Sequence, residues 1–219
     1  MSDVSRVEVR PEYAELAAAL MERLLEWGLG ARKRFVVGVA GESGSGKSVT
    51  ASTLARTLVA SGLSAVVLHQ DDYFHLPPRA NHAARERDIM HVGPGEVNLE
   101  LMQAHIAEFL HGGDAIVVPM VNYATDRFEA RRVELEGVTV LVVEGTYVLG
   151  LEDIDLRIFL EATYADTRDR RRTRARDVDS PFVERVLARE HDIIARCGEL
   201  ADLVVDRNFA IRAAGGSPP

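Results

Sequence analysis

The segment Gly41–Ser48 constrains this chain more than any other, because its sequence, GESGSGKS, matches the pattern G-x-x-x-x-G-K-[ST]. Glycines at these positions let the backbone curl so that several N–H groups point at one phosphate chain. Lys47 would neutralise the β- and γ-phosphates, Ser48 would offer its hydroxyl to Mg²⁺, and the next helix would turn its positive end toward the anion. The pattern predicts a nucleotide site with contacts from Gly41, Ser43, Gly44, Ser45, Gly46, Lys47, Ser48 and Val49.

The sequence around this loop supports the same prediction. An apolar run at residues 35–40 precedes the loop and is typical of a buried strand. A helix is predicted from about Lys47 to Ser61, and Gly62 would end it. The alternative is a flexible glycine–serine turn, which would require neither the strand nor the helix. The two flanks therefore favour a phosphate-binding loop.

Apolar runs alternate with helical patterns along the rest of the chain. Strands are predicted at residues 65–69, 115–119, 138–143, 156–160 and 202–205, and helices at 11–29, 98–110, 164–177 and from Ser180–Pro181 onward. This order predicts an α/β P-loop fold, doubly wound around a mostly parallel five-stranded sheet with helices on both faces. Residues 73–97 show little periodicity and are expected to be irregular. We expect one domain over residues 1–212 and a disordered tail at 213–219.

Composition limits the classes of partner. The 219 residues carry a net charge of −8, so the chain lacks a global basic field for nucleic acid. The single cysteine, Cys197, excludes an intramolecular disulfide and fits a reducing compartment. Neither a membrane span nor a signal peptide is predicted, so a cytoplasmic protein without a membrane partner is the expectation.

Two acidic positions follow predicted strands. Asp71 lies just past the second strand, and ligands of such folds bind at the carboxyl ends of parallel strands, so its carboxylate could reach an acceptor hydroxyl. Asp72 competes for the role of base, and one of the two could instead cap a turn. Glu144 follows an apolar run, where a carboxylate is costly unless it meets a cation. The alternative for Glu144 is a surface acid at the start of a loop.

Several motifs together resemble one family. The loop, the segment His69–Phe74 (HQDDYF), the Glu-Gly of residues 144–145 and the arginine-rich residues 167–177 are similar to motifs of the uridine kinase and phosphoribulokinase group of small-molecule kinases. HQDDYF and residues 179–182 (DSPF) also resemble nicotinamide riboside kinases. The resemblance covers roughly residues 35–206.

The resemblance implies an ATP-dependent kinase that uses Mg²⁺ and acts on a small hydroxyl compound. It implies that Asp71 is the base and that the Mg²⁺ site is formed by Ser48, Glu144 and Asp71, with Glu144 binding directly or through water. It further implies that residues 164–177 form a lid helix. Arg168, Arg172 and Arg176 are spaced four apart and would share one face of this helix, where they could bind the phosphates. Arg172 is the catalytic candidate among them. A solvated helix face paired with nearby aspartates is the alternative.

The acceptor site departs from the family pattern. Uridine kinases carry an Asn-Phe-Asp-His-Pro-like segment where this chain has residues 90–96 (MHVGPGE). The histidine that they carry five residues after a tyrosine is Phe128 here. These differences argue against uridine itself but not against kinase chemistry. The candidate acceptor contacts are Asp71, Tyr73, His91, Tyr123 and Arg127.

Other interpretations keep part of this prediction. Nicotinamide riboside, pantothenate and a phosphorylated sugar are alternative acceptors within the family. A P-loop ATPase or a regulatory nucleotide-binding protein without a small acceptor is the alternative from another class. A GTPase switch is disfavoured because neither lysine follows an asparagine, which the guanine-reading Asn-Lys-x-Asp motif requires. The acceptor, the choice between ATP and GTP, the contacting lid arginines and a homo-oligomeric state stay open.

Overall fold

The computed structural model describes residues 10–167 and 180–214. Its main sheet has six strands in the order β2-β5-β1-β6-β7-β8, and its second sheet pairs β3 with β4. The strands are β1 (Phe35–Gly41), β2 (Ala65–His69), β3 (Ala115–Asn122), β4 (Arg127–Glu134), β5 (Val140–Glu144), β6 (Leu156–Leu160), β7 (Leu203–Val205) and β8 (Ile211–Ala213). The α-helices are α1 (Pro11–Glu26), α2 (Lys47–Ala60), α3 (Pro78–Arg87), α4 (Leu99–His111) and α6 (Pro181–Ile194).

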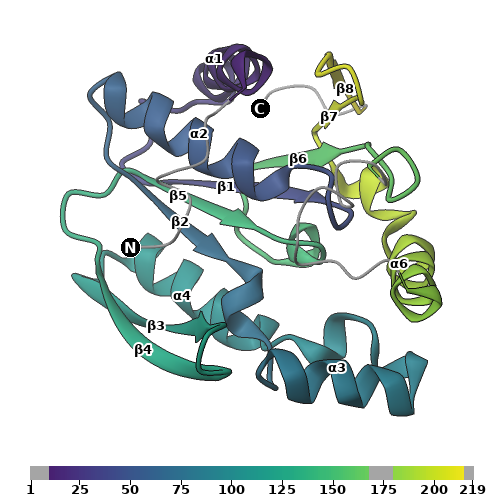
Figure 1. The fold of residues 1–219 in the computed structure, drawn as a ribbon. Helices are drawn as coiled ribbons and strands as arrows, with labels where there is room; N and C mark the ends of the chain where they lie inside the picture. Colours follow the sequence, from purple (N-terminus) through teal and green to yellow (C-terminus); the bar gives the residue numbers. More distant parts are fainter. Residues whose placement is uncertain (1–9, 168–179, 215–219) are drawn as a thin grey trace.

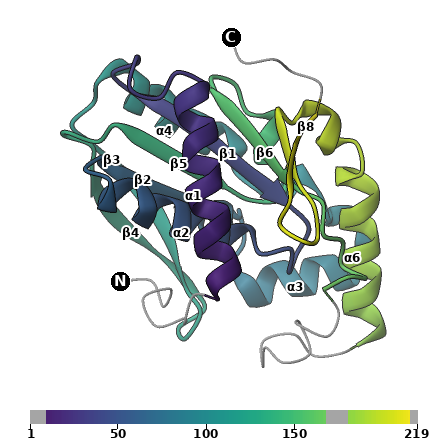
Figure 2. The same ribbon diagram turned by 90° about the horizontal axis from the view of Figure 1, so that it is seen from above.

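Helices cover both faces of the main sheet, as the sequence predicts (Figure 1). Successive residues of the central strand β1 point to opposite faces, so Val37 joins the core under α1 and α2 while Val36 joins the core on the α4 side. Every residue of β1 and of β5 is buried, which explains why these strands are continuous apolar runs. Figure 2, seen from above, shows α1 lying across the sheet with α2 beside it.

The mostly parallel α/β sheet is confirmed, but one predicted strand lies outside it and the sheet has six strands rather than five. Residues 115–119 do form a strand, but this strand, β3, pairs antiparallel with β4 in a separate hairpin. Ile116 and Val118 are buried while Val117 between them is 57% exposed. One face of β3 is therefore buried and the other faces solvent, whereas a central strand of a parallel sheet is buried on both faces. Five strands run parallel, in the order β2, β5, β1, β6 and β7, and β8 adds an antiparallel edge.

Two expectations about irregular segments were also wrong. Residues 73–97 contain the helix α3, which has Pro78 as its first residue. The only buried residues of α3 are Asn81 and Ala84. A helix with so few buried apolar residues leaves little periodic signal. The tail was expected from residue 213, but Ala213 ends β8, and residues 215–219 lie outside the described part of the chain.

The remaining helix bounds agree with the sequence or differ at an end. The first helix stops at Glu26 rather than at residue 29, and α2 ends at Ala60 with Gly62 at a positive φ of 86°. Ser180 caps α6, because its side chain accepts a hydrogen bond from the Val183 N–H. The predicted lid helix falls mainly on residues 168–179, which lie outside the described residues.

Within residues 10–167 and 180–214, no helix combines the length and the apolar character needed to cross a bilayer.

Candidate active site

The carboxyl ends of three neighbouring parallel strands bring the predicted site residues to one edge of the sheet. In the register of the sheet, Glu144 at the end of β5 lies opposite His69 at the end of β2 and opposite Val39 of β1. Asp71 follows β2 within a short 3₁₀ turn, and the glycine-rich loop follows β1. Phosphate loop, Asp71 and Glu144 therefore share the edge at which ligands of open α/β sheets bind.

Two glycines of the loop are required by close approach. A Cβ atom at Gly41 would lie 2.6 Å from Ser45 Oγ and 2.9 Å from the Leu160 carbonyl oxygen. Gly46 has a φ of 99° and lies directly against the Tyr13 hydroxyl of α1, so a side chain there would be strained and would clash. Lys47 then begins α2 and its Nζ donates to the Glu42 carbonyl oxygen at 3.4 Å. The loop has the shape of an anion cradle at a helix N-terminus.

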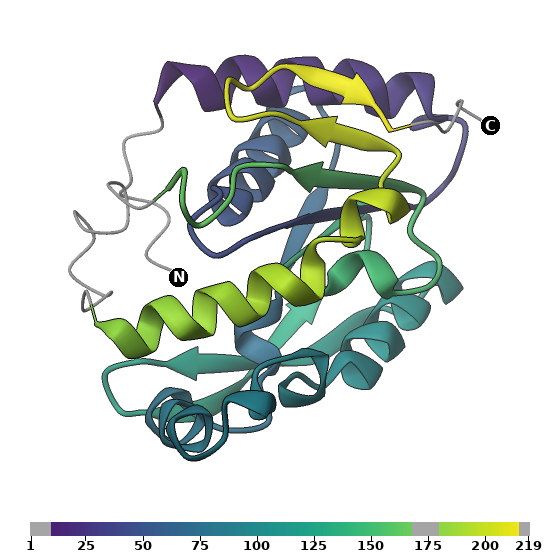
Figure 3. The ribbon, with the colours of Figure 1, turned by 90° about the vertical axis from the view of Figure 1, so that its right-hand side faces the viewer.

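Glu42, within the loop, makes contacts that the motif did not reveal. Its side chain is 5% exposed, and its Oε1 lies 2.6 Å from His191 Nδ1 of α6. Its Oε2 accepts a hydrogen bond from the Tyr164 backbone N–H at 2.5 Å. Through Glu42, the loop is fastened to α6 and to the chain just before residue 168. Figure 3 shows α6 crossing this side of the molecule.

The two adjacent aspartates have different surroundings. Asp72 Oδ1 accepts a hydrogen bond from the Val121 N–H at 2.8 Å, which ties the turn after β2 to the β3–β4 hairpin. The Asp71 side chain is accessible to solvent, and it makes no hydrogen bond within the described residues. Desolvation by the surrounding protein raises the pKa of Asp71, Glu144 raises it further, and Lys47 lowers it. Asp72 thus has a structural partner, while the Asp71 carboxylate is open to a ligand.

Glu144 is buried beside a histidine that the sequence did not single out. Glu144 is 2% exposed, and its Oε1 lies 2.7 Å from His69 Nδ1. Burial opposes the charge of His69, but the hydrogen bond and charge of Glu144, together with the charges of Asp72 and Asp71, outweigh it and raise the pKa of His69. The second oxygen, Glu144 Oε2, is buried and has no hydrogen-bond partner among the described residues.

These oxygens fit a magnesium ion that arrives with a nucleotide. The orphaned Glu144 Oε2, the Ser48 hydroxyl and the Asp71 carboxylate are hard oxygen donors, the type that Mg²⁺ prefers. Within the described residues, no group of three or more His, Cys, Asp or Glu side chains forms a cage for a metal. A few protein oxygens combined with phosphate oxygens is the usual arrangement for Mg²⁺ in kinases.

The structure places the predicted acceptor contacts in several different regions. Tyr73 was expected at the site, but it is 1% exposed in the core and its hydroxyl lies 2.8 Å from His105 Nδ1, so that prediction is corrected. Tyr123 and Arg127 are exposed at the tip of the β3–β4 hairpin. His91 is half-buried, with Nε2 3.1 Å from Asn81 Oδ1. The lid candidates Arg168, Arg172 and Arg176 lie outside the described residues.

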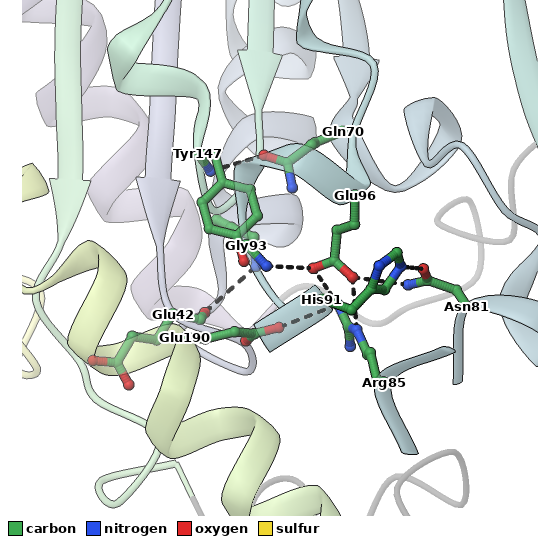
Figure 4. Close-up of polar contacts among 10 residues, drawn as sticks. Glu42, Gln70, Asn81, Arg85, His91, Gly93, Glu96, Tyr147 and Glu190 are labelled. Atoms are coloured by element: carbon green, nitrogen blue, oxygen red, sulfur yellow. Dashed lines mark hydrogen bonds and ion pairs between the residues drawn. The ribbon is translucent and has the colours of Figure 1, made fainter. Parts of the chain in front are cut away.

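A buried polar network, shown in Figure 4, lies beyond what the motifs predicted. Arg85 of α3 donates to both carboxylate oxygens of Glu96 at 2.7 Å, and Glu96 also accepts from Asn81 and from the Gly93 N–H. Glu190 of α6 lies 3.6 Å from Arg85. The sequence motifs did not predict this set, because its members between residues 81 and 96 form no apolar periodic pattern and Glu190 lies far from them in the chain.

A small pocket lies beside the loop. It is formed where the ends of β6 and β7 approach the phosphate loop, and the residues that line it are Ser45, Thr50, Leu160, Ala162, Val205, Asp206, Arg207 and Phe209. Phe209 also packs edge-on against Tyr13 of α1 at 5.0 Å between ring centroids. The pocket has apolar walls and a few polar groups.

Comparison with known proteins agrees with this geometry. Residues 36–208 match the model of the phosphoribulokinase / uridine kinase family. The chain is 29% identical over 211 residues to the bifunctional alpha-galactosidase/sucrose kinase AgaSK of Mediterraneibacter gnavus, which covers 89% of this chain and 22% of that protein. It is 27% identical over 194 residues to a uridine kinase of Proteus mirabilis, which covers 82% of this chain and 90% of that protein.

A solved structure has the same arrangement of elements. The crystal structure of a "putative fructose transport system kinase" from Silicibacter sp. TM1040 superposes with a TM-score of 0.65 at 27% identity, covering 82% of this chain and 94% of that one. The chain spans about a fifth of the length of AgaSK but nearly all of the Silicibacter protein. The two most similar matches named here are thus a protein with a sucrose kinase activity and one associated with fructose transport.

Proposed function

The chain belongs to the phosphoribulokinase / uridine kinase family, and from this membership we propose that it transfers the γ-phosphate of ATP to a hydroxyl of a small nucleoside- or sugar-like acceptor. The observation that carries the proposal is the meeting of the phosphate loop, Asp71 and Glu144 at one sheet edge. Lys47 and Glu144 act on the pKa of Asp71 in opposite directions, which indicates that the three charges are close to one another.

Each residue of the site has a separate role in the proposed reaction. The loop N–H groups and Lys47 hold the β- and γ-phosphates, and Asp71 holds the acceptor hydroxyl in line with the γ-phosphorus. The acceptor oxygen forms a bond to this phosphorus as its proton passes to the Asp71 carboxylate. The bond from the phosphorus to the β–γ bridging oxygen breaks, and its electron pair leaves with ADP. Desolvation raises the pKa of Asp71, which makes its carboxylate a stronger base than an exposed aspartate.

Magnesium has a defined place in this proposal. Ser48 and Glu144 would hold Mg²⁺, with Asp71 as a further oxygen donor, and the ion would neutralise charge on the phosphates. His69 fixes the orientation of Glu144 through the 2.7 Å contact and leaves Glu144 Oε2 for the ion or its water.

The similar proteins bear on the acceptor. AgaSK has a sucrose kinase activity and the Silicibacter protein is associated with fructose transport, and this chain lacks two features of the uridine pattern, with Phe128 in place of a histidine. A sugar-like acceptor therefore has more support than uridine. Nicotinamide riboside and pantothenate belong in the same acceptor panel.

The decisive experiment is an acceptor screen. The protein is incubated with MgATP and sugars, nucleosides and vitamins, and ADP release is followed by a coupled assay. At least one acceptor is expected to raise ADP release well above the rate without acceptor. Equal rates with and without every compound would favour the ATPase or regulatory alternative.

Asp71→Asn tests the base. Removal of a general base costs about 10²–10⁴-fold in rate, so the variant should bind ATP normally and lose transfer by about that factor. The matched control is Asp72→Asn, because an amide oxygen at residue 72 can still accept from the Val121 N–H. If Asp72→Asn loses transfer and Asp71→Asn keeps it, the base is Asp72.

A further inference from the structure

Glu190 is a buried acid whose charge is only partly compensated. It lies on α6 and is 8% exposed, and its Oε1 is 3.6 Å from an Arg85 nitrogen, beyond hydrogen-bond distance. Arg85 is already engaged by both oxygens of Glu96 at 2.7 Å. Glu190 Oε2 has no hydrogen-bond partner in the part of the chain that the structure describes.

Two more polar atoms beside Glu190 lack a partner in residues 10–167 and 180–214. They are the Tyr147 hydroxyl, on a side chain that is 6% exposed, and Arg189 Nε. Figure 4 draws Tyr147 and Glu190 within the same polar cluster, and the charge of Glu190 raises the pKa of the Tyr147 hydroxyl while that of Arg189 lowers it. A buried polar group without a hydrogen bond costs on the order of 1–3 kcal/mol. Three such atoms in one cluster indicate a partner that residues 10–167 and 180–214 do not supply.

This cluster adjoins the proposed base. The Gln70 side-chain oxygen accepts a hydrogen bond from the Tyr147 N–H at 2.8 Å, and Gln70 immediately precedes Asp71 (Figure 4). Lys47 and Asp71 both influence the pKa of Glu190, so it also lies within electrostatic reach of the phosphate loop. The backbone of Tyr147 therefore adjoins the turn that carries Asp71, and Glu190 lies on the same side of the molecule.

The charges around the cluster select a neutral ligand. Arg85 lies between the carboxylates of Glu96 and Glu190, so the described side chains around the cluster carry no excess of positive charge that would attract an anion. A phosphate or carboxylate on the ligand would meet two buried carboxylates and be repelled. A hydroxyl fits, because it can donate to a carboxylate oxygen and accept from a phenol at the same time.

We propose that Glu190 and Tyr147 form a subsite that binds a second hydroxyl of the acceptor, which makes the acceptor an uncharged polyhydroxy compound of the sugar class. Glu190 Oε2 accepts a hydrogen bond from this hydroxyl and the Tyr147 hydroxyl donates one to it. Arg85, held by Glu96, keeps Glu190 in place. The subsite rests on the proposed function, since it recognises a different hydroxyl of the same acceptor, and it disfavours a phosphorylated sugar.

The test measures binding separately from transfer. Fructose, sucrose and uridine are titrated by calorimetry into the wild-type protein with MgADP, together with analogues that lack single hydroxyls. At least one compound should bind, and removal of one non-reacting hydroxyl should weaken binding about tenfold or more, because the buried groups are then left unpaired.

Two variants locate the subsite. Tyr147→Phe and Glu190→Gln should each weaken binding of the parent compound about tenfold and leave binding of the matching deoxy analogue nearly unchanged. Tyr147→Phe removes a hydroxyl that has no partner among the described residues, so its melting temperature should equal or exceed that of the wild type. The matched control is Asp192→Asn, which replaces an exposed acid on the same helix. It should change neither the binding affinity nor the melting temperature.

Each other outcome has a definite meaning. If Tyr147→Phe lowers the melting temperature and binding is unaffected, the cluster holds a structural water and the subsite proposal is wrong. Equal losses for the parent and deoxy compounds, or no binding by any polyhydroxy compound, also overturn it. Hydroxyl-dependent binding without ADP release would refute the kinase proposal and keep the subsite. If an acceptor raises ADP release and neither variant alters that release, the kinase proposal stands and the subsite proposal is wrong.

Discussion

At the scale of single residues, four ionisable groups in and beside the site, His69, Asp71, Asp72 and Glu190, have pKa values above their ordinary ones. Burial raises the pKa of Glu190 to about 7, and desolvation raises the pKa of Asp71 and of Asp72. Glu144 raises the pKa of His69 against the opposing effect of burial. In each case the folded chain holds its proton to a higher pH than the unfolded chain does. Stability from these groups is therefore present at low pH and lost as the pH rises through the folded pKa values.

Glu190→Gln should flatten this pH dependence. From an unfolded pKa near 4.5 to a folded value of about 7, native Glu190 keeps a proton that the unfolded state has released. Over this window the group removes up to about 1.4 kcal/mol of stability per pH unit. Urea unfolding between pH 4.5 and 7.5 should show a smaller decline for the variant than for the wild type. Parallel curves would show that Glu190 is ionised throughout.

At the scale of elements, one buried ion pair joins α3 to the turn that ends at Glu96. Arg85 of α3 binds Glu96 with two hydrogen bonds of 2.7 Å, and the Asn81 side chain and the Gly93 N–H donate to the same carboxylate at 3.0 Å and 3.2 Å. Because a bidentate guanidinium–carboxylate pair fixes both position and angle, α3 and this turn behave as one unit.

Arg85→Met should be more damaging than the loss of one contact suggests. It leaves Glu96 and Glu190 buried without their cation, which costs about 3–5 kcal/mol. The double variant Arg85→Met with Glu96→Gln removes one of the stranded charges and should recover part of the loss. Both are measured as free energies of unfolding in urea. A double variant less stable than the sum of the two single changes would contradict this account.

At the scale of the whole molecule, nucleotide binding joins parts of the chain that are far apart. The N-terminal helix α1 contacts the phosphate loop through Tyr13, and α6 contacts it through His191 and Glu42. A ligand in the loop therefore stabilises contacts with both ends of the described chain. Any ligand that binds only the folded state raises its stability by mass action.

MgATP should accordingly raise the melting temperature of the entire protein. At a hundredfold excess over Kd the gain is about 2.7 kcal/mol, or about 5–10 °C for a chain of this size. Lys47→Ala should abolish most of the shift. The chain offers a matched control in its only other lysine, Lys33, which is exposed before β1 and whose replacement should leave the shift intact. A full shift in Lys47→Ala would show that nucleotide binds elsewhere.

Much of the fold could be predicted because it depends on local patterns. The strand, loop and helix around Gly41–Ser48 follow from apolar periodicity and from positions where only glycine fits. Asp71 and Glu144 could be placed because a residue just past a buried parallel strand must lie at the ligand-binding edge. The helix α3 and the strand β4 were missed because their exposed, charged residues leave little periodic signal.

The sequence by itself therefore determined the phosphate loop, the α/β layers and the position of two acids, Asp71 and Glu144, at the carboxyl ends of β2 and β5. Only the tertiary structure decided that Asp72 holds the hairpin while Asp71 is open, that His69 pairs with Glu144, and that Arg85 links Glu96 to Glu190. The reason is physical: backbone preference and burial leave periodic marks along a chain, whereas a hydrogen bond between distant side chains depends on where the fold brings them, and no spacing records that.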